Sequence, residues 1–385
     1  MALRQYLIEL VLNVVSTKDD KSFRSKRKHL KLRTNQLVSI AVDVMGGDHA
    51  PGEIVKGALQ ALDLFPVKLV LVGPELAVQS ELTRLKATPD QLARITVKNA
   101  TEIVEMSESP TQSFKRKKDS SIRVGINALK QGNVEAFVSA GNTGAVMTAA
   151  TLVLGRISGV ERPAIATVFP SMKGQILLLD MGSNVDCKPH HLVQFGVMGS
   201  SFSQVCMGVE TPRVALLNIG EEAEKGNEVT QAAYPMFSEA PVNFIGNIES
   251  KQIMFDEADV IVCDGFVGNN ILKFGEGITK FFIAFFKQAA KTSLLSKIGL
   301  VFLYPALKRF KKSTDHEEFG GAPLLGVNGV TIIAHGSSHA KAIMNAIRTA
   351  FDAIESQMIS KIAAGIEAEN EAHKIASAVV EEPVV

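Results

Sequence analysis

Short runs of β-branched and aliphatic residues alternate with longer segments of helical period from Ser39 to His335, and this alternation most constrains the fold. Parallel strands need a crossover connection, which is usually a helix. The pattern therefore predicts an α/β protein with three layers, α/β/α, in which helices cover both faces of a mainly parallel sheet. We expect strands at 39–45, 67–73, 95–97, 135–140, 164–169, 175–180, 213–219, 242–247, 259–264 and 330–335.

Composition excludes several classes of protein. The net charge of +1 argues against a general nucleic-acid binder, which is usually clearly basic. Cys187, Cys206 and Cys263 lie far apart, without the paired spacing of a zinc site. We interpret them as reduced thiols of a cytoplasmic protein. We expect neither a metal nor a cofactor.

The length of 385 residues favours two lobes around a cleft. Residues 1–37 carry nine Lys or Arg and three Asp or Glu. Their apolar run precedes the basic stretch, the reverse of a secretory signal, so they indicate a loosely ordered extension or a start codon placed too early. A weak membrane-surface helix is the alternative. We assign 38–360 to the catalytic α/β/α domain and 361–385 to a helix end and tail.

Glycine-rich turns follow seven expected strands, with the sequences "DVMGGDHAP", "SAGNTGA", "DMGSNVDCKP", "NIGEEAEKGNE", "IGNIE", "DGFVGNN" and "AHGSS". Glycine lets a ligand approach the backbone, and the helix that follows presents free N–H groups to an anion. We expect these turns to share one sheet edge and to bind a small anion, with inorganic phosphate first. The expected binding residues are Asp43, Gly46, Gly47, Asp48, His49, Ser139, Gly141, Asn142, Thr143, Asn184, Asp186, Lys188, Asn227, Asp264, Gly268 and His335.

Two residues of these turns suit acyl transfer to an anion. Lys225 supplies a cation that can hold an anionic nucleophile near an acyl carbonyl, and the amide of Asn269 can donate to a developing oxyanion. The alternatives are a solvated loop lysine for Lys225 and a helix N-cap for Asn269. Thr143 is likewise a good N-cap.

Other kinds of catalytic site are disfavoured. The chain has no G-x-S-x-G elbow, no Walker loop and no G-x-G-x-x-G dinucleotide fingerprint. Asp43, Asp48 and His49 lack a second cluster that would complete a metal site. We interpret His190 and His191 as surface or capping residues.

Taken together, the motifs "IAVDVMGGDHAP", "SAGNTGA", "GRISGVERPA", "LLDMGSNVDCKP", "LLNIGEEAEKGNE", "FIGNIE", "DVIVCDGFVGNNILK" and "AHGSS" closely resemble the bacterial phosphate acyltransferases of phospholipid synthesis. The resemblance covers about residues 38–355. It implies a fold similar to those of phosphate acetyltransferases and isopropylmalate dehydrogenases.

The resemblance also implies an activity. Such an enzyme transfers a fatty acyl chain from acyl carrier protein to inorganic phosphate, works as a homodimer at the membrane face, and feeds a downstream glycerol-3-phosphate acyltransferase. By motif, Lys225 of "KGN" and Asn269 after "DGFVG" match the expected catalytic positions. Two departures are the extension 1–37 and His190, which stands where an acidic residue is common.

A basic run offers a surface for the acidic carrier protein. Lys115, Arg116, Lys117 and Lys118 precede an expected helix and form what we call the carrier-protein patch. Such a patch would steer the carrier mainly through the association rate. The alternative is a solvated face.

Residues 292–312 are apolar and basic, and the interval between Glu276 and Asp315 holds eight Lys or Arg and no acid. The longest apolar run has ten residues, too few to span a bilayer. We predict a membrane-docking helical hairpin with a turn at Tyr304–Pro305; a buried helix pair of a dimer is the alternative. We assign the phenylalanines of 280–287 to core or dimer contacts. The docking residues are Leu294, Leu295, Ile298, Val301, Phe302 and Leu307.

Three rival functions remain open. A phosphate acetyl- or butyryltransferase that uses coenzyme A would share the fold, but it would not need the apolar and basic segment 292–312. An NAD-dependent hydroxy-acid dehydrogenase would need a dinucleotide site and metal-binding aspartates. A membrane-associated scaffold would have no use for the glycine turns.

Overall fold

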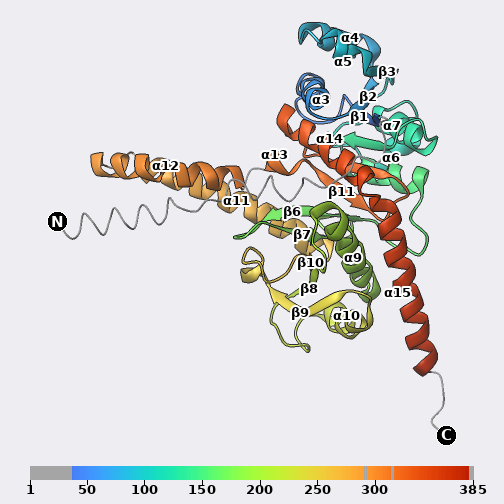
Figure 1. Cartoon of the computed structure of the whole chain (residues 1–385), viewed down its shortest axis with the longest axis vertical. Coiled ribbons are helices and arrows are strands. Elements are labelled where there is room, and N and C mark those ends of the chain that lie inside the picture. The colour runs from blue at the N-terminus through green and yellow to red at the C-terminus, as the bar shows by residue number, and fades with distance from the viewer. Residues whose placement is uncertain (1–36, 290, 292, 314–315, 381–385) are drawn as a thin grey trace. The chain divides into compact units, whose positions relative to one another are not determined.

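The computed structural model describes residues 37–289, 291, 293–313 and 316–380, so the extension 1–37 lies almost wholly outside the described residues. The described strands form two sheets (Figure 1). The seven-stranded sheet has the order β3 (Ile95–Asn99), β2 (Val67–Gly73), β1 (Val38–Asp43), β4 (Ala136–Ser139), β12 (Val330–Ile333), β11 (Ala322–Leu325), β5 (Ala164–Ile165). The five-stranded sheet has the order β6 (Thr167–Pro170), β7 (Gln175–Leu179), β10 (Val260–Val262), β8 (Arg213–Asn218), β9 (Asn243–Glu249).

Most neighbouring strands are parallel, as predicted. The pairs of β1 with β2 and β4, and of β10 with β7 and β8, are all parallel. The antiparallel pairs are β11 with β12 and β5, and β6 with β7. The predicted mainly parallel α/β class is confirmed.

Every expected strand is present, with two differences. The run 164–169 is divided between β5 of one sheet and β6 of the other, and at the division Ala166 N donates to Pro323 O at 3.0 Å. β11 was not predicted, because its "APLL" sequence contains Pro323, and proline argues against a strand. The glycine turns consequently lie at the edges of two sheets, and the expectation of one shared edge is wrong.

Helices cover both faces of the seven-stranded sheet. Alternate residues of β1 face opposite cores: Ile40 packs in the cluster that contains Ile343, and Ala41 in the cluster that contains Ile122. The helices of the first face are α3 (Gly52–Leu64) and α14 (Ala340–Glu355), and those of the second include α7 (Ser121–Lys130) and α8 (Thr143–Ala149). Burial on both faces explains why the strands read as nearly continuous apolar runs.

The five-stranded sheet is covered in the same way. α9 (Pro189–Phe202) and α10 (Glu228–Glu239) pack on one face, and α9 also packs against α15 (Met358–Val380). Ile271 and Leu272 of α11 (Gly265–Ala289) pack in the cluster of the other face. The other described helices are α4 (Glu75–Arg84), α5 (Pro89–Ala93), α6 (Pro110–Arg116), α12 (Leu294–Ser313), α13 (His316–Phe319), a 3₁₀ turn at Ser250–Gln252 and π-helical turns at Ala150–Leu154 and Ser203–Met207.

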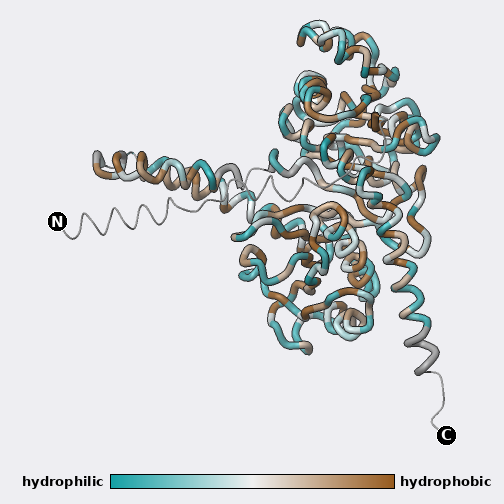
Figure 2. The backbone as a smooth tube through the Cα atoms, in the orientation of Figure 1, coloured by the Kyte–Doolittle hydropathy of each residue, from teal (hydrophilic) through white to brown (hydrophobic). Residues whose placement is uncertain are grey.

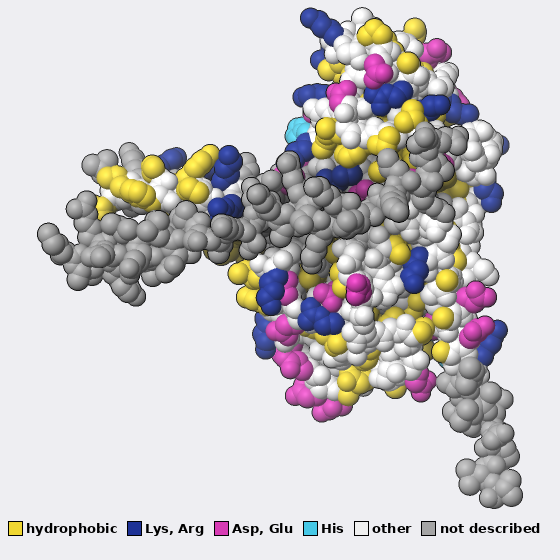
Figure 3. Space-filling model, in the orientation of Figure 1, with side chains coloured by type: hydrophobic (Ala, Val, Ile, Leu, Met, Phe, Trp, Pro, Cys, Tyr) yellow, Lys and Arg dark blue, Asp and Glu magenta, His cyan; other side chains and the backbone are white. Residues whose placement is uncertain are grey.

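The segment predicted as a hairpin with a turn at Tyr304–Pro305 is one continuous helix, α12. A proline inside a helix removes one backbone hydrogen bond and need not end it. Hydrophobic and hydrophilic residues are interspersed along α12 (Figure 2). Its hydrophobic side chains are exposed, and Lys and Arg side chains lie beside them (Figure 3).

The phenylalanines of α11 are also exposed. Phe281 stacks on Phe285 with ring centroids 6.2 Å apart, as the helical spacing predicts. Because 59% of Phe281 and 55% of Phe285 are exposed, their assignment to the core of this chain is wrong.

Candidate active site

The first part of the candidate site lies at the carboxyl edge of the seven-stranded sheet. Asp43 ends β1, and its buried carboxylate accepts hydrogen bonds from Ser139 Oγ at 2.7 Å and from Met45 N at 3.1 Å. Gly141 N donates to Ser139 Oγ at 3.0 Å. Residues predicted from separate motifs therefore form one hydrogen-bond network.

Glycines let the turns of this network approach each other. A Cβ atom on Gly46 would lie 2.5 Å from Gly141 N, so a side chain is excluded there. Gly47 has φ +97°, a conformation that residues with a side chain rarely adopt. The glycines expected to bring the backbone close to a ligand thus also bring two turns close to each other.

The carboxyl group of Asp43 is engaged inside the protein. Burial raises the pKa of its carboxyl, and hydrogen bonds from Ser121, Ser139 and the backbone oppose the rise. The hydrogen bonds of this buried group hold the two turns in place. The exposed polar residues around it are the ones that can contact a ligand from solvent.

Exposed polar residues surround this network. Asp48 N donates to Gly336 O at 2.8 Å, which joins the turn after β1 to the turn after β12. His335 Nδ1 lies 2.8 Å from Ser337 Oγ in that second turn. His49 stacks on His339 at 4.3 Å. The predicted residues Asp48, His49 and His335 are therefore neighbours and exposed.

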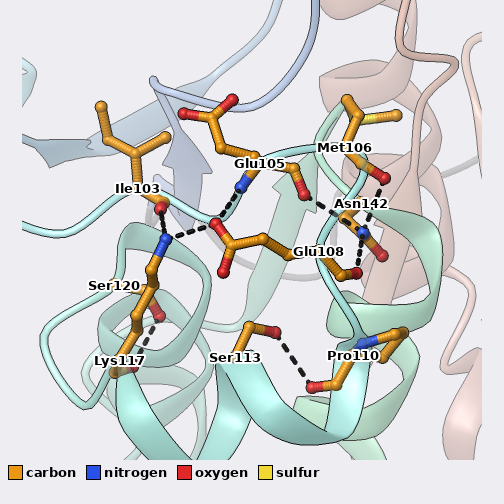
Figure 4. Close-up of polar contacts among 9 residues, drawn as sticks. All are labelled: Ile103, Glu105, Met106, Glu108, Pro110, Ser113, Lys117, Ser120 and Asn142. Carbon is orange, nitrogen blue, oxygen red and sulfur yellow. Dashed lines mark hydrogen bonds and ion pairs between the residues drawn. The ribbon is translucent and has the colours of Figure 1, made fainter.

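The side-chain amide of Asn142 is engaged by other groups of the protein, and its expected ligand contact stays a prediction (Figure 4). Its Oδ1 accepts from Ala145 N at 3.0 Å, which makes Asn142, and not Thr143, the N-cap of α8. Its Nδ2 donates to the carbonyl groups of Glu105, Met106 and Glu108, at 3.3, 3.0 and 3.1 Å. These bonds hold the 105–108 loop on the start of the helix. Thr143 is exposed.

One residue of the carrier-protein patch supports the same loop. Lys117 Nζ donates to Ile103 O at 2.5 Å and forms an ion pair with Glu108 (Figure 4). The hydrogen bond from Lys117 holds the pKa of Glu108 below its usual value. Lys115, Arg116 and Lys118 are exposed, so the patch is reduced to these three cations.

The second part of the candidate site lies at the carboxyl edge of the five-stranded sheet. β8 and β10 are neighbouring parallel strands. Lys225 lies in the loop after β8, and Asn269 lies in the first turns of α11, directly after β10. Both residues are exposed. The two expected catalytic residues therefore follow adjacent strands.

The loop of Lys225 is held by its backbone. Lys225 N donates to Glu222 O at 3.1 Å, and Asn218 Nδ2 donates to Lys225 O at 2.9 Å. Among the described residues no carboxylate forms an ion pair with Lys225. Asn227 accepts from Thr230 N at 2.9 Å and so caps α10.

Asn269 is not an N-cap. Asp264 fills that role for α11, because its Oδ1 accepts from Val267 N at 2.7 Å. Asn269 packs beside Gly182, where a Cβ atom would lie 3.5 Å from Asn269 Cβ. Gly268 is buried against the turn that follows β7. The amide of Asn269 thus remains available to a ligand.

The remaining predicted residues lie in the turn after β7. The side chain of Asn184 is buried, and its Nδ2 donates to Pro163 O at 2.7 Å, so it holds the turn. Asp186 and Lys188 are exposed. No hydrogen bond among the described residues joins the side chains of the first part of the site to those of the second.

His191 is buried and is not a surface residue, but the other half of its interpretation is confirmed, because its side chain caps the start of α9. Glu161 Oε2 lies 2.8 Å from His190 Nε2 and 3.3 Å from His191 Nε2. His191 Nδ1 accepts from Lys188 N at 3.1 Å, so Nε2 carries the proton of the neutral ring. A metal needs that nitrogen without its proton, and a ligating histidine donates from its other nitrogen. The cluster therefore suits hydrogen bonds between the two histidines and Glu161, and not a metal.

A hollow of about 530 Å³ lies at the opposite end of the seven-stranded sheet. Ser39, Lys68 and Asn133, among its lining residues, lie at or before the amino ends of their strands. Ligands of such sheets bind at the carboxyl ends, so this hollow is separate from the candidate active site.

Sequence reasoning missed Asp180. This residue directly follows β7, and it is fully buried at the centre of a hydrogen-bonded turn. Its signal was present, because "LLLD" before "MGS" repeats the pattern of "AVD" before "VMGG" at Asp43.

Comparisons with known proteins agree with this architecture. The family model described as "Fatty acid synthesis protein" matches residues 38–361. A phosphate acyltransferase of Desulfitobacterium hafniense is 50% identical over 327 residues, which are 85% of this chain and 96% of the relative. One of Heliobacterium modesticaldum is 50% identical over 323 residues, 84% of this chain and 96% of the relative.

Among solved structures, a phosphotransacetylase of Streptococcus pyogenes superposes with a TM-score of 0.55 at 16% identity, over 84% of this chain and 94% of that one. The expected fold similarity to phosphate acetyltransferases is thereby confirmed, and the similarity to isopropylmalate dehydrogenases stays a prediction. The family model and the two relatives cover most of the chain, and this chain therefore belongs to the fatty acid synthesis protein family, as an acyltransferase of the phosphate acyltransferase group.

Proposed function

We propose that this protein transfers a long-chain fatty acyl group from acyl carrier protein to inorganic phosphate and so forms acyl phosphate for phosphatidic acid synthesis. The observation that carries the proposal is the exposure of Lys225 and Asn269 after two adjacent parallel strands. One is a cation suited to phosphate, and the other is an amide donor suited to an oxyanion.

The reaction needs no covalent enzyme intermediate. A phosphate oxygen attacks the thioester carbonyl carbon, a tetrahedral oxyanion forms, and the C–S bond breaks as the carrier thiolate leaves and takes up a proton. Lys225 holds the phosphate, and Asn269 donates to the oxyanion; one such donor typically contributes ~10²–10³ in rate. Holding both reactants in line is worth roughly 7–11 kcal/mol.

The direct test incubates purified protein and labelled phosphate with palmitoyl acyl carrier protein, and in parallel with acetyl- or butyryl-coenzyme A. Acyl phosphate should form fastest from the long-chain carrier thioester. Faster turnover of the short coenzyme A thioesters would instead support a phosphate acetyl- or butyryltransferase.

The carrier protein is proposed to dock on the exposed cations of the carrier-protein patch. Lys115 and Arg116 end α6, and this helix packs against α8, which begins at the Asn142 cap. The patch therefore lies beside a turn of the candidate site. Complementary charge would bring an acidic carrier to that position.

Peripheral docking of α12 to the inner face of the cytoplasmic membrane is proposed from its surface. Leu295 is 84% exposed and Phe302 is 82% exposed, and Lys308 and Arg309 are exposed on the same helix. No described helix is long and apolar enough to cross a bilayer. Exposed apolar and basic side chains on one helix suit an anionic membrane surface.

A homodimer is proposed from the aromatic surface of α11. Phe274, Phe281 and Phe285 are each more than half exposed, and contiguous exposed apolar surface of this kind marks an interface.

The proposed product, acyl phosphate, is hydrophobic and labile. Its release at the membrane, beside a downstream glycerol-3-phosphate acyltransferase, would protect it from hydrolysis.

A further inference from the structure

The carboxylate of Asp180 is saturated with hydrogen bonds inside the protein. Its Oδ1 accepts from Ile165 N at 3.0 Å, from Ser183 N at 3.3 Å and from Ser183 Oγ. Its Oδ2 accepts from Asn184 N at 2.6 Å and from Asn184 Nδ2 at 3.0 Å. A carboxylate has about four acceptor sites, so these five contacts leave none for a substrate. Asp180 therefore acts on other residues of the protein.

These contacts join the two sheets. Asp180 follows β7 of the five-stranded sheet, whereas Ile165 belongs to β5 of the seven-stranded sheet. Met181 N donates back to Ile165 O at 3.0 Å, and Asn184 Nδ2 donates to Pro163 O at 2.7 Å. The turn 180–184 is thus fastened to both sheets.

The same turn supports the start of α11. Gly265 N donates to Asn184 O at 2.7 Å, and a Cβ atom on Gly268 would lie 2.0 Å from Asp180 O. Asn269 is the next residue, and it packs beside Gly182. Any displacement of the turn is therefore transmitted to Asn269 through direct contacts.

We propose that Asp180 is a positioning residue for acyl transfer, which fixes the turn 180–184 between the two sheets and through it sets the place of the Asn269 amide. This inference rests on the proposed role of Asn269. A displacement of about 1 Å can reduce a rate ~10²-fold, so the rigidity of such a support affects catalysis directly.

Asp180→Asn is the informative substitution. Asparagine keeps one acceptor oxygen but places an NH₂ group against the N–H donors of either Ile165 and Ser183 or Asn184, so the turn must shift. Because an oxyanion donor acts in the transition state, we expect kcat to fall about 10–100-fold while KM for phosphate changes less than about two-fold.

A double-mutant cycle distinguishes positioning from a general loss of stability. If Asp180 acts through Asn269, then Asp180→Asn combined with Asn269→Ala has the same kcat as Asn269→Ala alone. Asp259→Asn is the matched control, because Asp259 pairs with Arg213 at 3.0 Å just before β10, at the opposite end of the same sheet. Its kcat should stay at the wild-type value.

The outcomes are separable. Three results would overturn the inference. Asp180→Asn could lower kcat by the same factor in wild type and in Asn269→Ala, or it could leave kcat unchanged. The control Asp259→Asn could also lower kcat as much as Asp180→Asn does. If Asp180→Asn does not fold, Ser183→Ala removes one donor to the same carboxylate and takes its place in the cycle. If the enzyme accepts only a coenzyme A thioester, the proposed acyl donor is wrong, and the same cycle is run with that thioester.

Discussion

Glutamate at two exposed apolar positions of α12 tests the proposed membrane docking. Ile298 is 51% exposed and Phe302 is 82% exposed, so both have surface to bury in a leaflet. Full burial of a large apolar side chain contributes roughly 1.5–3 kcal/mol. Scaled by these exposed fractions, the pair contributes about 2–4 kcal/mol, and each 1.4 kcal/mol is a tenfold change in binding. Ile298→Glu with Phe302→Glu should therefore weaken vesicle binding roughly 30- to 700-fold.

The measurement is co-sedimentation with anionic vesicles of phosphatidylglycerol and phosphatidylethanolamine, at several lipid concentrations. The matched control is Leu76→Glu with Leu92→Glu, two exposed leucines of α4 and α5. Wild type and control should pellet with the vesicles, whereas the α12 variant should stay in the supernatant and still form acyl phosphate. Equal partition of the α12 variant and wild type would refute the docking proposal.

Three further predictions concern the site and its support. Lys225→Ala and Asn269→Ala should each lower acyl phosphate formation ~10²-fold or more with unchanged circular dichroism, and near-normal turnover in both would remove them from the mechanism. Lys115→Glu should raise KM for the carrier protein more at low than at high salt, because the charge is exposed; a KM independent of salt would count against the patch. Gly268→Ala should lower the free energy of unfolding by about 1–3 kcal/mol, because the Cβ of the new alanine would lie 2.0 Å from Asp180 O. Gly277→Ala in the same helix, with open space around its Cβ, is the control and should not lower the melting temperature.

The sequence by itself determined the fold class and the positions of most strands. Strands buried on both faces must be apolar throughout, and this local requirement is visible as runs such as "VKLVLVG" of β2. The glycine turns and the positions of Lys225 and Asn269 after strands also followed from local sequence. These features depend on neighbouring residues, which is why periodicity and composition found them.

The tertiary structure alone decided how the strands divide and which polar groups are already engaged. β11 contains a proline, and besides the neighbouring β12 it pairs with β5 from a much earlier part of the chain, so no local pattern indicated it. Asn142 and Lys117 resemble ligand-binding residues in sequence, but their partners lie in the 103–108 loop, and only folding brings them together. The sequence places Asp180 at the end of a strand, but only folding brings its carboxylate to the backbone N–H of Ile165 in the other sheet. Hydrogen bonds between residues distant in sequence leave no periodic trace, so a sequence identifies the candidates for a site and the fold selects among them.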